Sequence, residues 1–185
     1  AEITFCEPTL AARETAAADV IERTNATLVH PYDDPNVIAG QGTAAMELFE
    51  QAGSVDAMIA PVGGGGLMSG TCITTRALLP ETRLFGVEPE GADDAARSLA
   101  AGEYIPQMGP DTICDGLLTS MGKLTWPILK DHLEDIITVS DDEVIEAMRL
   151  LLKHLGMVVE PSGATTLAAI LRPEFRALEG IDRVG

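Results

Sequence analysis

The sequence is poor in basic side chains: 12 Lys and Arg stand against 29 Asp and Glu, so the formal net charge is -17. Such a charge repels nucleic-acid phosphates and anionic lipid headgroups. Long hydrophobic runs are missing too, because Gly, Pro or a charge interrupts each one before the roughly 20 residues that a membrane-spanning helix needs. We therefore expect no nucleic-acid partner and no membrane span. An anionic ligand must be held by a local group of hydrogen-bond donors, such as the backbone amides at the start of a helix.

Cysteine is also scarce. Cys6, Cys72 and Cys114 are far apart and lack the spacing of a zinc site, so we interpret the last two as small packing residues. No basic segment followed by an apolar one opens the chain, so we see no secretory signal and expect a cytoplasmic protein. The chain begins at Ala1 without a Met and ends on the approach to a further strand. We expect a piece of something longer.

Two segments differ in their patterns. Residues 1–32 are predicted to form a strand, a helix and a strand, at residues 3–6, 10–24 and 27–30. This segment is too short for a domain, and we interpret it as the remnant of a small domain. Residues 33–185 are expected to form a large domain that is truncated at its C-terminal end.

Short apolar strands alternate with helices from residue 57 on. This alternation predicts an α/β fold of three layers, with a mostly parallel sheet covered by helices on both faces. The expected strands are residues 57–60, 83–88, 136–139 and 157–159, and the expected helices are residues 37–52, 67–79, 93–101, 126–132, 141–155 and 163–171. A capping box from Ser140 to Glu143 marks the start of the helix that ends at Gly156. Residues 102–122 form an irregular stretch long enough for a functional loop or a lid.

Four consecutive glycines follow the first of these strands and precede a helix. Gly63, Gly64, Gly65 and Gly66 leave several backbone N–H groups free to point into one space, which suits a phosphate. The run completes neither a dinucleotide-binding GxGxxG nor a P-loop, whose Lys is missing. The alternative is a loose turn packed against the sheet, but an ordinary turn needs only one or two glycines. The pattern favours phosphate binding.

Carboxylates gather after the next strand, at Glu88, Glu90, Asp93 and Asp94. Together with freed carbonyl groups they could surround a hard cation such as magnesium, manganese or calcium. A solvated acidic turn followed by a helix N-terminus, which favours Asp, explains the same residues. The spacing alone leaves both interpretations open.

Residues 160–163, Glu-Pro-Ser-Gly, lie where a strand ends and a helix begins. Parallel-sheet proteins place ligand-facing groups at this position. A buried Glu160 would need a partner, so we favour a site role for it. For Ser162 a site role and a simple helix cap are equally compatible with the sequence.

As a set, these motifs resemble serine racemase and the related serine/threonine dehydratases. The matching segments, in the same order and spacing, are residues 62–67 (VGGGGL), 86–90 (GVEPE), 113–116 (ICDG) and 159–163 (VEPSG). The residues from His30 to Asp33, with residues 37–43, are similar to the segment that joins the two domains of that family. The likeness extends over essentially the whole chain.

The resemblance implies a fold-type II pyridoxal phosphate (PLP) enzyme. In the family, a glycine loop binds the cofactor phosphate through backbone amides, a further backbone segment lines the pocket, and a Glu approaches the cofactor ring. The corresponding positions here are Gly63, Gly64, Gly65, Gly66 and Leu67 for the phosphate, Gly116 for the pocket wall, and Glu160 for the ring. The family's divalent cation would lie between Glu88, the carbonyl of Ala92, and Asp94.

The implied activity is that of a serine racemase or an L-serine or L-threonine ammonia-lyase. The substrate would react through an external aldimine, with the cofactor ring as electron sink. Racemisation and elimination use the same site, so the sequence does not decide between them. The resemblance also implies a homodimer for the complete enzyme.

The family's Schiff-base lysine is missing from this chain. The chain's lysines are Lys123, Lys130 and Lys153, and none lies in the Ser-x-Lys-x-Arg-Gly setting that carries the nucleophile in the family. The opposite-face serine of the family also precedes Ala1. We therefore expect no catalytic residue here and no turnover by this chain alone. The alternative is a non-catalytic phosphate-ligand binding fragment, or a partner-completed half of another fold-type II enzyme such as cysteine synthase.

Overall fold

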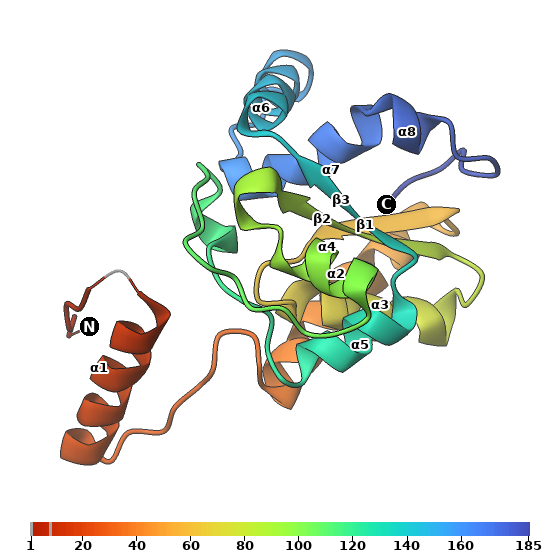
Figure 1. The fold of residues 1–185 in the computed structure, drawn as a ribbon. Coiled ribbons are helices and arrows are strands. Elements are labelled where there is room, and N and C mark those ends of the chain that lie inside the picture. The colour runs from red at the N-terminus through yellow and green to blue at the C-terminus, as the bar shows by residue number, and fades with distance from the viewer. Residues whose placement is uncertain (1, 8) are drawn as a thin grey trace. The chain divides into compact units, whose positions relative to one another are not determined.

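The computed structural model describes residues 2–7 and 9–185 (Figure 1). The chain divides into two compact units, Ala1–His30 and Pro31–Gly185. In chain order the elements are α1 (Leu10–Thr24), α2 (Pro35–Ala52), β1 (Ala57–Pro61), α3 (Gly66–Leu78), β2 (Arg83–Pro89), η1 (Glu90–Ala92), α4 (Asp94–Ala101), η2 (Asp115–Leu117), α5 (Thr125–His132), β3 (Asp135–Val139), α6 (Asp141–Leu155), α7 (Pro161–Leu171) and α8 (Pro173–Arg176). None of the helices described is both long and apolar enough to cross a membrane.

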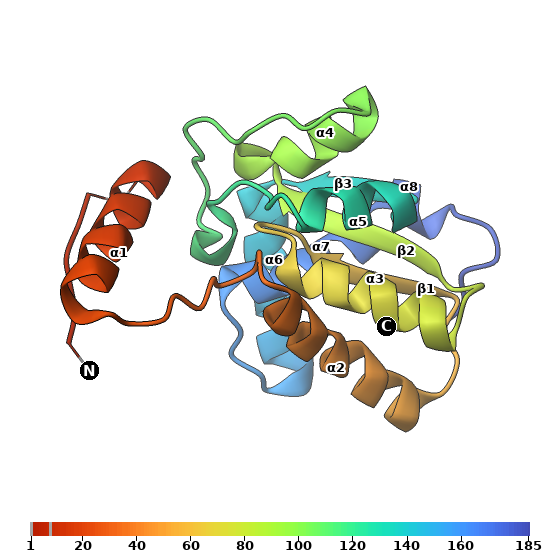
Figure 2. The ribbon, with the colours of Figure 1, turned by 90° about the horizontal axis from the view of Figure 1, so that it is seen from below.

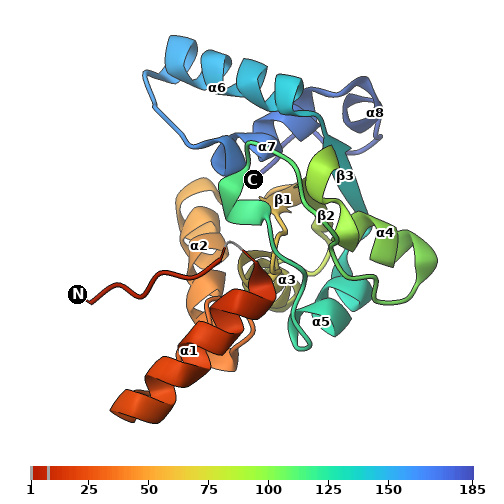
Figure 3. The same cartoon turned by 60° about the vertical axis from the view of Figure 1, so that its left-hand side comes forward.

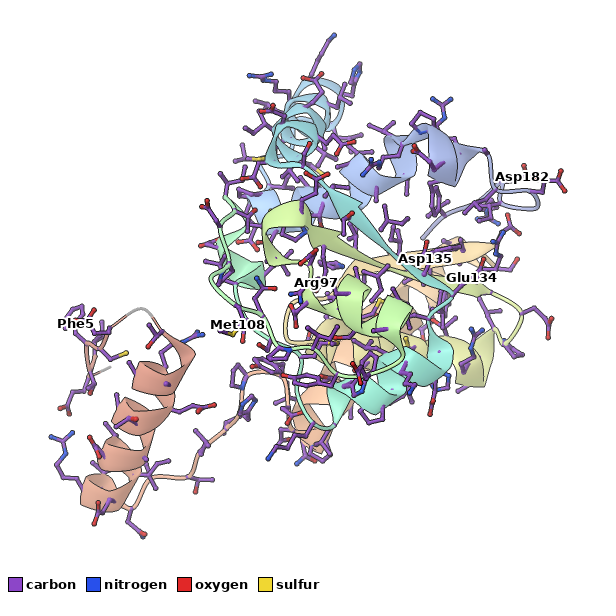
Figure 4. The ribbon with its side chains drawn as sticks, viewed as in Figure 1. Phe5, Arg97, Met108, Glu134, Asp135 and Asp182 are labelled. Atoms are coloured by element: carbon purple, nitrogen blue, oxygen red, sulfur yellow. The ribbon has the colours of Figure 1, made fainter. Side chains whose placement is uncertain are left out.

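Among the described residues of the first unit, helix α1 is the one regular element. The hydroxyl of Thr9 caps its start by accepting a hydrogen bond from the amide of Ala12 at 3.2 Å. The strands predicted at residues 3–6 and 27–30 are wrong: neither segment has regular structure, since a strand requires a partner and neither pairs within the described residues. Phe5, labelled in Figure 4, is 91% exposed. That this unit belongs to a small domain stays a prediction.

The second unit is built on a parallel sheet in the order β1-β2-β3. The register pairs Ile59 with Phe85 and Val87 with Ile137. Beyond the free edge of β1, Val184 forms an isolated parallel bridge to Ala57, which is where the sequence indicated the approach to a further strand. The predicted parallel α/β architecture is confirmed.

Successive side chains of a strand point to opposite faces of the sheet, where they pack into two separate hydrophobic cores. Along β1, Met58 and Ala60 pack with α2, α3 and α5, whereas Ala57 and Ile59 pack with α6 and α7. The helices therefore form an outer layer on each face of the sheet, as Figures 2 and 3 show. Both faces of β1 are apolar and almost entirely buried, as expected for a strand covered by helices on both sides.

The C-terminal half corrects two predictions. Residues 157–159 are not a strand, because no strand of the described sheet lies beside them, and Val158 is 89% exposed. Helix α7 begins at Pro161 with Glu160 as the N-cap residue, so Ser162 lies inside the first turn. Proline is favoured there because the first helical N–H has no intrahelical acceptor.

The predicted capping box of α6 is confirmed. The Ser140 hydroxyl accepts a hydrogen bond from the Glu143 amide at 3.3 Å, and the Glu143 carboxylate accepts one from the Ser140 amide at 2.8 Å. This box satisfies two of the amides that a helix start leaves without partners.

Helices α2 and α3 meet through two glycines. A Cβ atom added at Gly70 would lie 2.4 Å from the amide nitrogen of Gly42 and 2.4 Å from the carbonyl oxygen of Ile38. Both contacts are to backbone, which cannot move aside as a flexible side chain does. The distance between the two helices therefore depends on the absence of a side chain at Gly70.

Gly70→Ala should lower the free energy of unfolding by about 2 kcal/mol, because overpacking forces the two helices apart. Gly40→Ala is the matched control in α2, since its Cβ would meet no atom within 4 Å. That change should stabilise the helix by up to about 1 kcal/mol. Chemical denaturation monitored by circular dichroism measures both, and equal effects would contradict the close-approach explanation.

Candidate functional site

The glycine loop connects β1 to α3 at the C-terminal edge of the sheet, where parallel-sheet proteins bind ligands. A cavity of about 440 Å³ opens there. Its lining includes six of the predicted cofactor-site residues: Gly64, Gly65, Gly66, Leu67, Gly116 and Glu160. The seventh, Gly63, does not line the cavity, and a Cβ atom added there would lie 3.0 Å from the Leu117 side chain. A larger cavity of about 520 Å³ lies along β3, but none of the predicted site residues lines it.

Steric constraints explain why each of these four positions is occupied by glycine. Gly63 and Gly65 have φ angles of 50° and 87°, which residues with a Cβ atom adopt at a cost. The other two face Tyr32: a Cβ atom at Gly64 would lie 2.4 Å from the Tyr32 ring, and one at Gly66 would lie 2.8 Å from the Tyr32 Cβ. The loop is therefore a well-packed turn with a defined conformation, rather than a loose one.

The free amides of this loop form the centre of the site. Within the part of the chain that the structure describes, no protein group accepts a hydrogen bond from the amides of Gly63, Gly64, Gly66 or Leu67. The Gly65 amide donates to the Val62 carbonyl at 2.8 Å, so it is the one predicted phosphate donor that the turn itself uses. Four unpaired N–H groups at the start of α3, reinforced by the helix dipole, suit an anion.

The loop is supported from behind by side chains that the sequence did not single out. Thr125 donates a hydrogen bond from its hydroxyl to the Gly64 carbonyl at 2.8 Å. The Tyr32 and Thr119 hydroxyls lie 2.9 Å apart. Tyr32 belongs to a segment that the family resemblance included, whereas a single threonine between Leu and Trp carries no signal in the sequence.

The opposite wall of the cavity is formed by Gly116 and the start of α7, which a hydrogen bond links. The Gly116 amide donates to the Ser162 hydroxyl at 3.1 Å, so Ser162 holds the wall together and does not cap its helix. Glu160 lines the cavity but is exposed, contrary to the burial considered from the sequence. Cys114, next to this wall, is buried, which fits a packing role.

Glu88 and Asp94 form a second polar group, at the end of β2 and the start of α4. Both side chains are fully buried. One oxygen of Glu88 accepts a hydrogen bond from the Ala96 amide at 2.9 Å, and one oxygen of Asp94 accepts from the Met121 amide at 3.3 Å. The other oxygen of each carboxyl has no partner among the described residues. Such buried, unpaired oxygens carry a desolvation cost that a bound cation would relieve.

Burial changes the protonation of this pair. Burial, with the negative charge of Asp94 as the second cause, raises the pKa of Glu88 well above its usual value. Burial raises the pKa of Asp94 to about 6. The other two acidic residues do not join the pair: Glu90 is exposed, and Asp93 forms an ion pair with Arg97 at 2.7 Å. In the described residues no group of three His, Cys, Asp or Glu could hold a metal, so Glu88 and Asp94 would need further oxygen ligands, such as a backbone carbonyl or water.

Without added cation, the chain should lose stability as pH rises from about 4 to about 6. In this window the unfolded state has lost the Asp94 proton, while the folded state, with its raised pKa, still holds it. Asp94→Asn should flatten this slope, because the amide does not ionise, whereas exposed Asp131→Asn should leave it unchanged. Denaturation midpoints measured across this pH range test the prediction, and a steep slope that persists in Asp94→Asn would contradict it.

Comparison with known proteins points to one group. Serine racemase from Dictyostelium discoideum is 50% identical over 188 residues, which cover 100% of this chain and 58% of the relative. Its crystal structure superposes with a TM-score of 0.92. A β-hydroxyaspartate dehydratase from Paracoccus denitrificans is 52% identical, over 92% of this chain and 54% of the relative. The crystal structure of a T.th. threonine deaminase is 45% identical, with a TM-score of 0.91, over 100% of this chain and 60% of that one.

The chain thus spans a little over half the length of these relatives. The family model for pyridoxal-phosphate dependent enzymes matches residues 1–184, which is nearly the whole chain. The fold, the order of the motifs and the similarity to solved structures agree with the resemblance drawn from the sequence. The chain belongs to the family of pyridoxal-phosphate dependent enzymes of fold type II, in its serine racemase and threonine deaminase group.

Proposed function

We propose that this chain provides the phosphate-binding part of a PLP-dependent enzyme that acts on a β-hydroxy-α-amino acid. The observation that carries the proposal is the set of four unpaired amides at the start of α3. The names of the relatives support the substrate class, because serine, threonine and β-hydroxyaspartate all carry a hydroxyl on the carbon next to the α-carbon. The reaction is racemisation at the α-carbon or elimination of the β-hydroxyl group.

The residues at the cavity fit the cofactor by their chemistry. The free amides of Gly63, Gly64, Gly66 and Leu67 would hold its phosphate, and Gly116 and Glu160 would flank its ring. When bound, the cofactor supplies an electron sink for the charge that develops at the substrate α-carbon. This chain's own residues bind and orient the cofactor in a cavity on a rigid sheet edge, and their contribution is affinity and placement.

Proton transfer at the substrate is not assigned to any residue of this chain. Lys123, Lys130 and Lys153 are all exposed, and none of the three lines the cavity. We propose that the reactive lysine lies outside these 185 residues and that the chain alone binds PLP without turnover. Assembly as a homodimer and a cytoplasmic location remain predictions.

We also propose that a divalent cation binds between Glu88 and Asp94. The two unpaired buried oxygens support the site, since a cation would replace the protons that burial now favours on both carboxyls. The Ala92 carbonyl would complete the coordination together with water. The cation would stabilise the junction of β2 and α4 without touching the substrate.

The function is tested by a substrate panel. A full-length protein that contains this chain should convert L-serine, L-threonine or 3-hydroxyaspartate to its enantiomer or to an oxo acid and ammonia, measured by chiral chromatography and by ammonia release. The chain alone, given PLP, should show no turnover and no borohydride-reducible adduct. Activity that is confined to β-substitution, as in a cysteine synthase, would refute the proposal.

The cation is tested by thermal unfolding. Added Mn²⁺ or Ca²⁺ at pH 7.5 should raise the Tm of the chain by several degrees, because a ligand that binds only the folded state stabilises it. Glu88→Gln and Asp94→Asn should each remove this shift, whereas exposed Glu90→Gln should retain it. If all four proteins gain equally from the metal, the cation binds elsewhere.

A further inference from the structure

Thr125 lies at the first position of α5, with a side chain that is 0% exposed. Its hydroxyl accepts a hydrogen bond from the Gly122 amide at 2.8 Å and donates one to the Gly64 carbonyl at 2.8 Å. The Gly122 amide also approaches the Gly64 carbonyl, at 3.3 Å. The glycine loop and the start of α5, some sixty residues apart in the sequence, are therefore joined at one carbonyl oxygen.

The direction of the Gly64 carbonyl matters for an anion site. Peptide units between glycines rotate at little steric cost, since no Cβ atom restricts them. A carbonyl oxygen that turned toward the cavity would present negative charge to a phosphate and would redirect the neighbouring amides. By donating to this oxygen, Thr125 holds it on the side of α5. The loop amides without a protein acceptor can then stay available to a ligand.

The segment that carries Thr125 is itself fixed. The Asp33 carboxylate accepts hydrogen bonds from the Lys123 amide at 3.0 Å and from the Leu124 amide at 2.8 Å. These bonds satisfy N–H groups just ahead of α5, where a carboxylate is favoured by the helix dipole. The Thr125 hydroxyl is thus presented to the glycine loop from a segment that is held by two hydrogen bonds to Asp33.

We propose that Thr125 is a positioning residue for phosphate binding: its hydroxyl orients the Gly64 peptide so that the glycine-loop amides are preorganised for the dianionic phosphate of the cofactor. Thr125 does not touch the phosphate. The inference rests on the proposed function, and it adds a residue that lies behind the cavity and does not line it.

The test compares three variants of the 185-residue chain with the parent. Thr125→Val removes the hydroxyl at nearly constant volume, and Thr125→Ser keeps it. Thr75→Val is the matched control, because Thr75 is equally buried in α3 and its hydroxyl has no partner among the described residues. The Kd of PLP is measured by quenching of Trp126, the only tryptophan and the neighbour of Thr125. Pyridoxal, which lacks the phosphate, serves as the second probe.

Thr125→Val should weaken PLP binding about fivefold to tenfold, as expected for one lost hydrogen bond. The affinity for pyridoxal should not change, and the ³¹P resonance of bound PLP should broaden or shift toward its position in free PLP. Thr125→Ser should restore both values, and Thr75→Val should match the parent. Thermal unfolding is recorded in parallel, and binding is measured well below each Tm, so that lost stability is not mistaken for lost affinity.

Three results would overturn the inference. If Thr125→Val lowers the Tm but binds PLP like the parent, Thr125 is only structural, and the proposed function is untouched. If Thr75→Val loses as much affinity as Thr125→Val, the effect is not specific to the Gly64 carbonyl. If the parent binds PLP no better than pyridoxal, the phosphate site itself is refuted, and the inference and the cofactor proposal fail together.

Discussion

The backbone of the glycine loop is the constraint on which the rest of this structure depends. An anion can be bound in a chain of net charge -17 only where unpaired N–H groups outweigh the general repulsion, and the loop places four of them together. The parallel sheet fixes where the loop begins, and α3 fixes where it ends. Tyr32 and Thr125 then restrict it from two sides, so the glycines are held in one conformation.

Much of the fold and of the candidate site could be predicted from the sequence, because the patterns that indicate them lie within short segments. The alternation of apolar strands and helices predicted the parallel sheet, and Ser140 with Glu143 predicted the start of α6. The glycine run, Gly116 and Glu160 were expected at one site, and the structure brings all of them except Gly63 to one cavity. The short apolar runs at residues 3–6 and 157–159 were misassigned, since an apolar run becomes a strand only where another strand lies beside it.

The parts that escaped prediction depend on contacts between distant segments. Nothing in the local sequence distinguishes Thr125 from a surface threonine, or shows that the Gly65 amide turns back to Val62. The pairing of Glu88 with Asp94 was one of two interpretations of an acidic cluster. Only burial separates the two carboxyls with unpaired oxygens from Glu90 and Asp93, which face solvent or an arginine.

The contact between Gly42 and Gly70 affects the orientation of α3 at the glycine loop as well as the packing of the two helices. Gly70 lies one helical turn beyond Gly66, so the crossing with α2 sets the tilt of α3 close to its first residues. A helix dipole acts along its axis and fades within about one turn, so small changes of tilt redirect the field at the cavity. Two residues without side chains, neither of which lines the cavity, thereby set the direction of the helix dipole at the glycine loop.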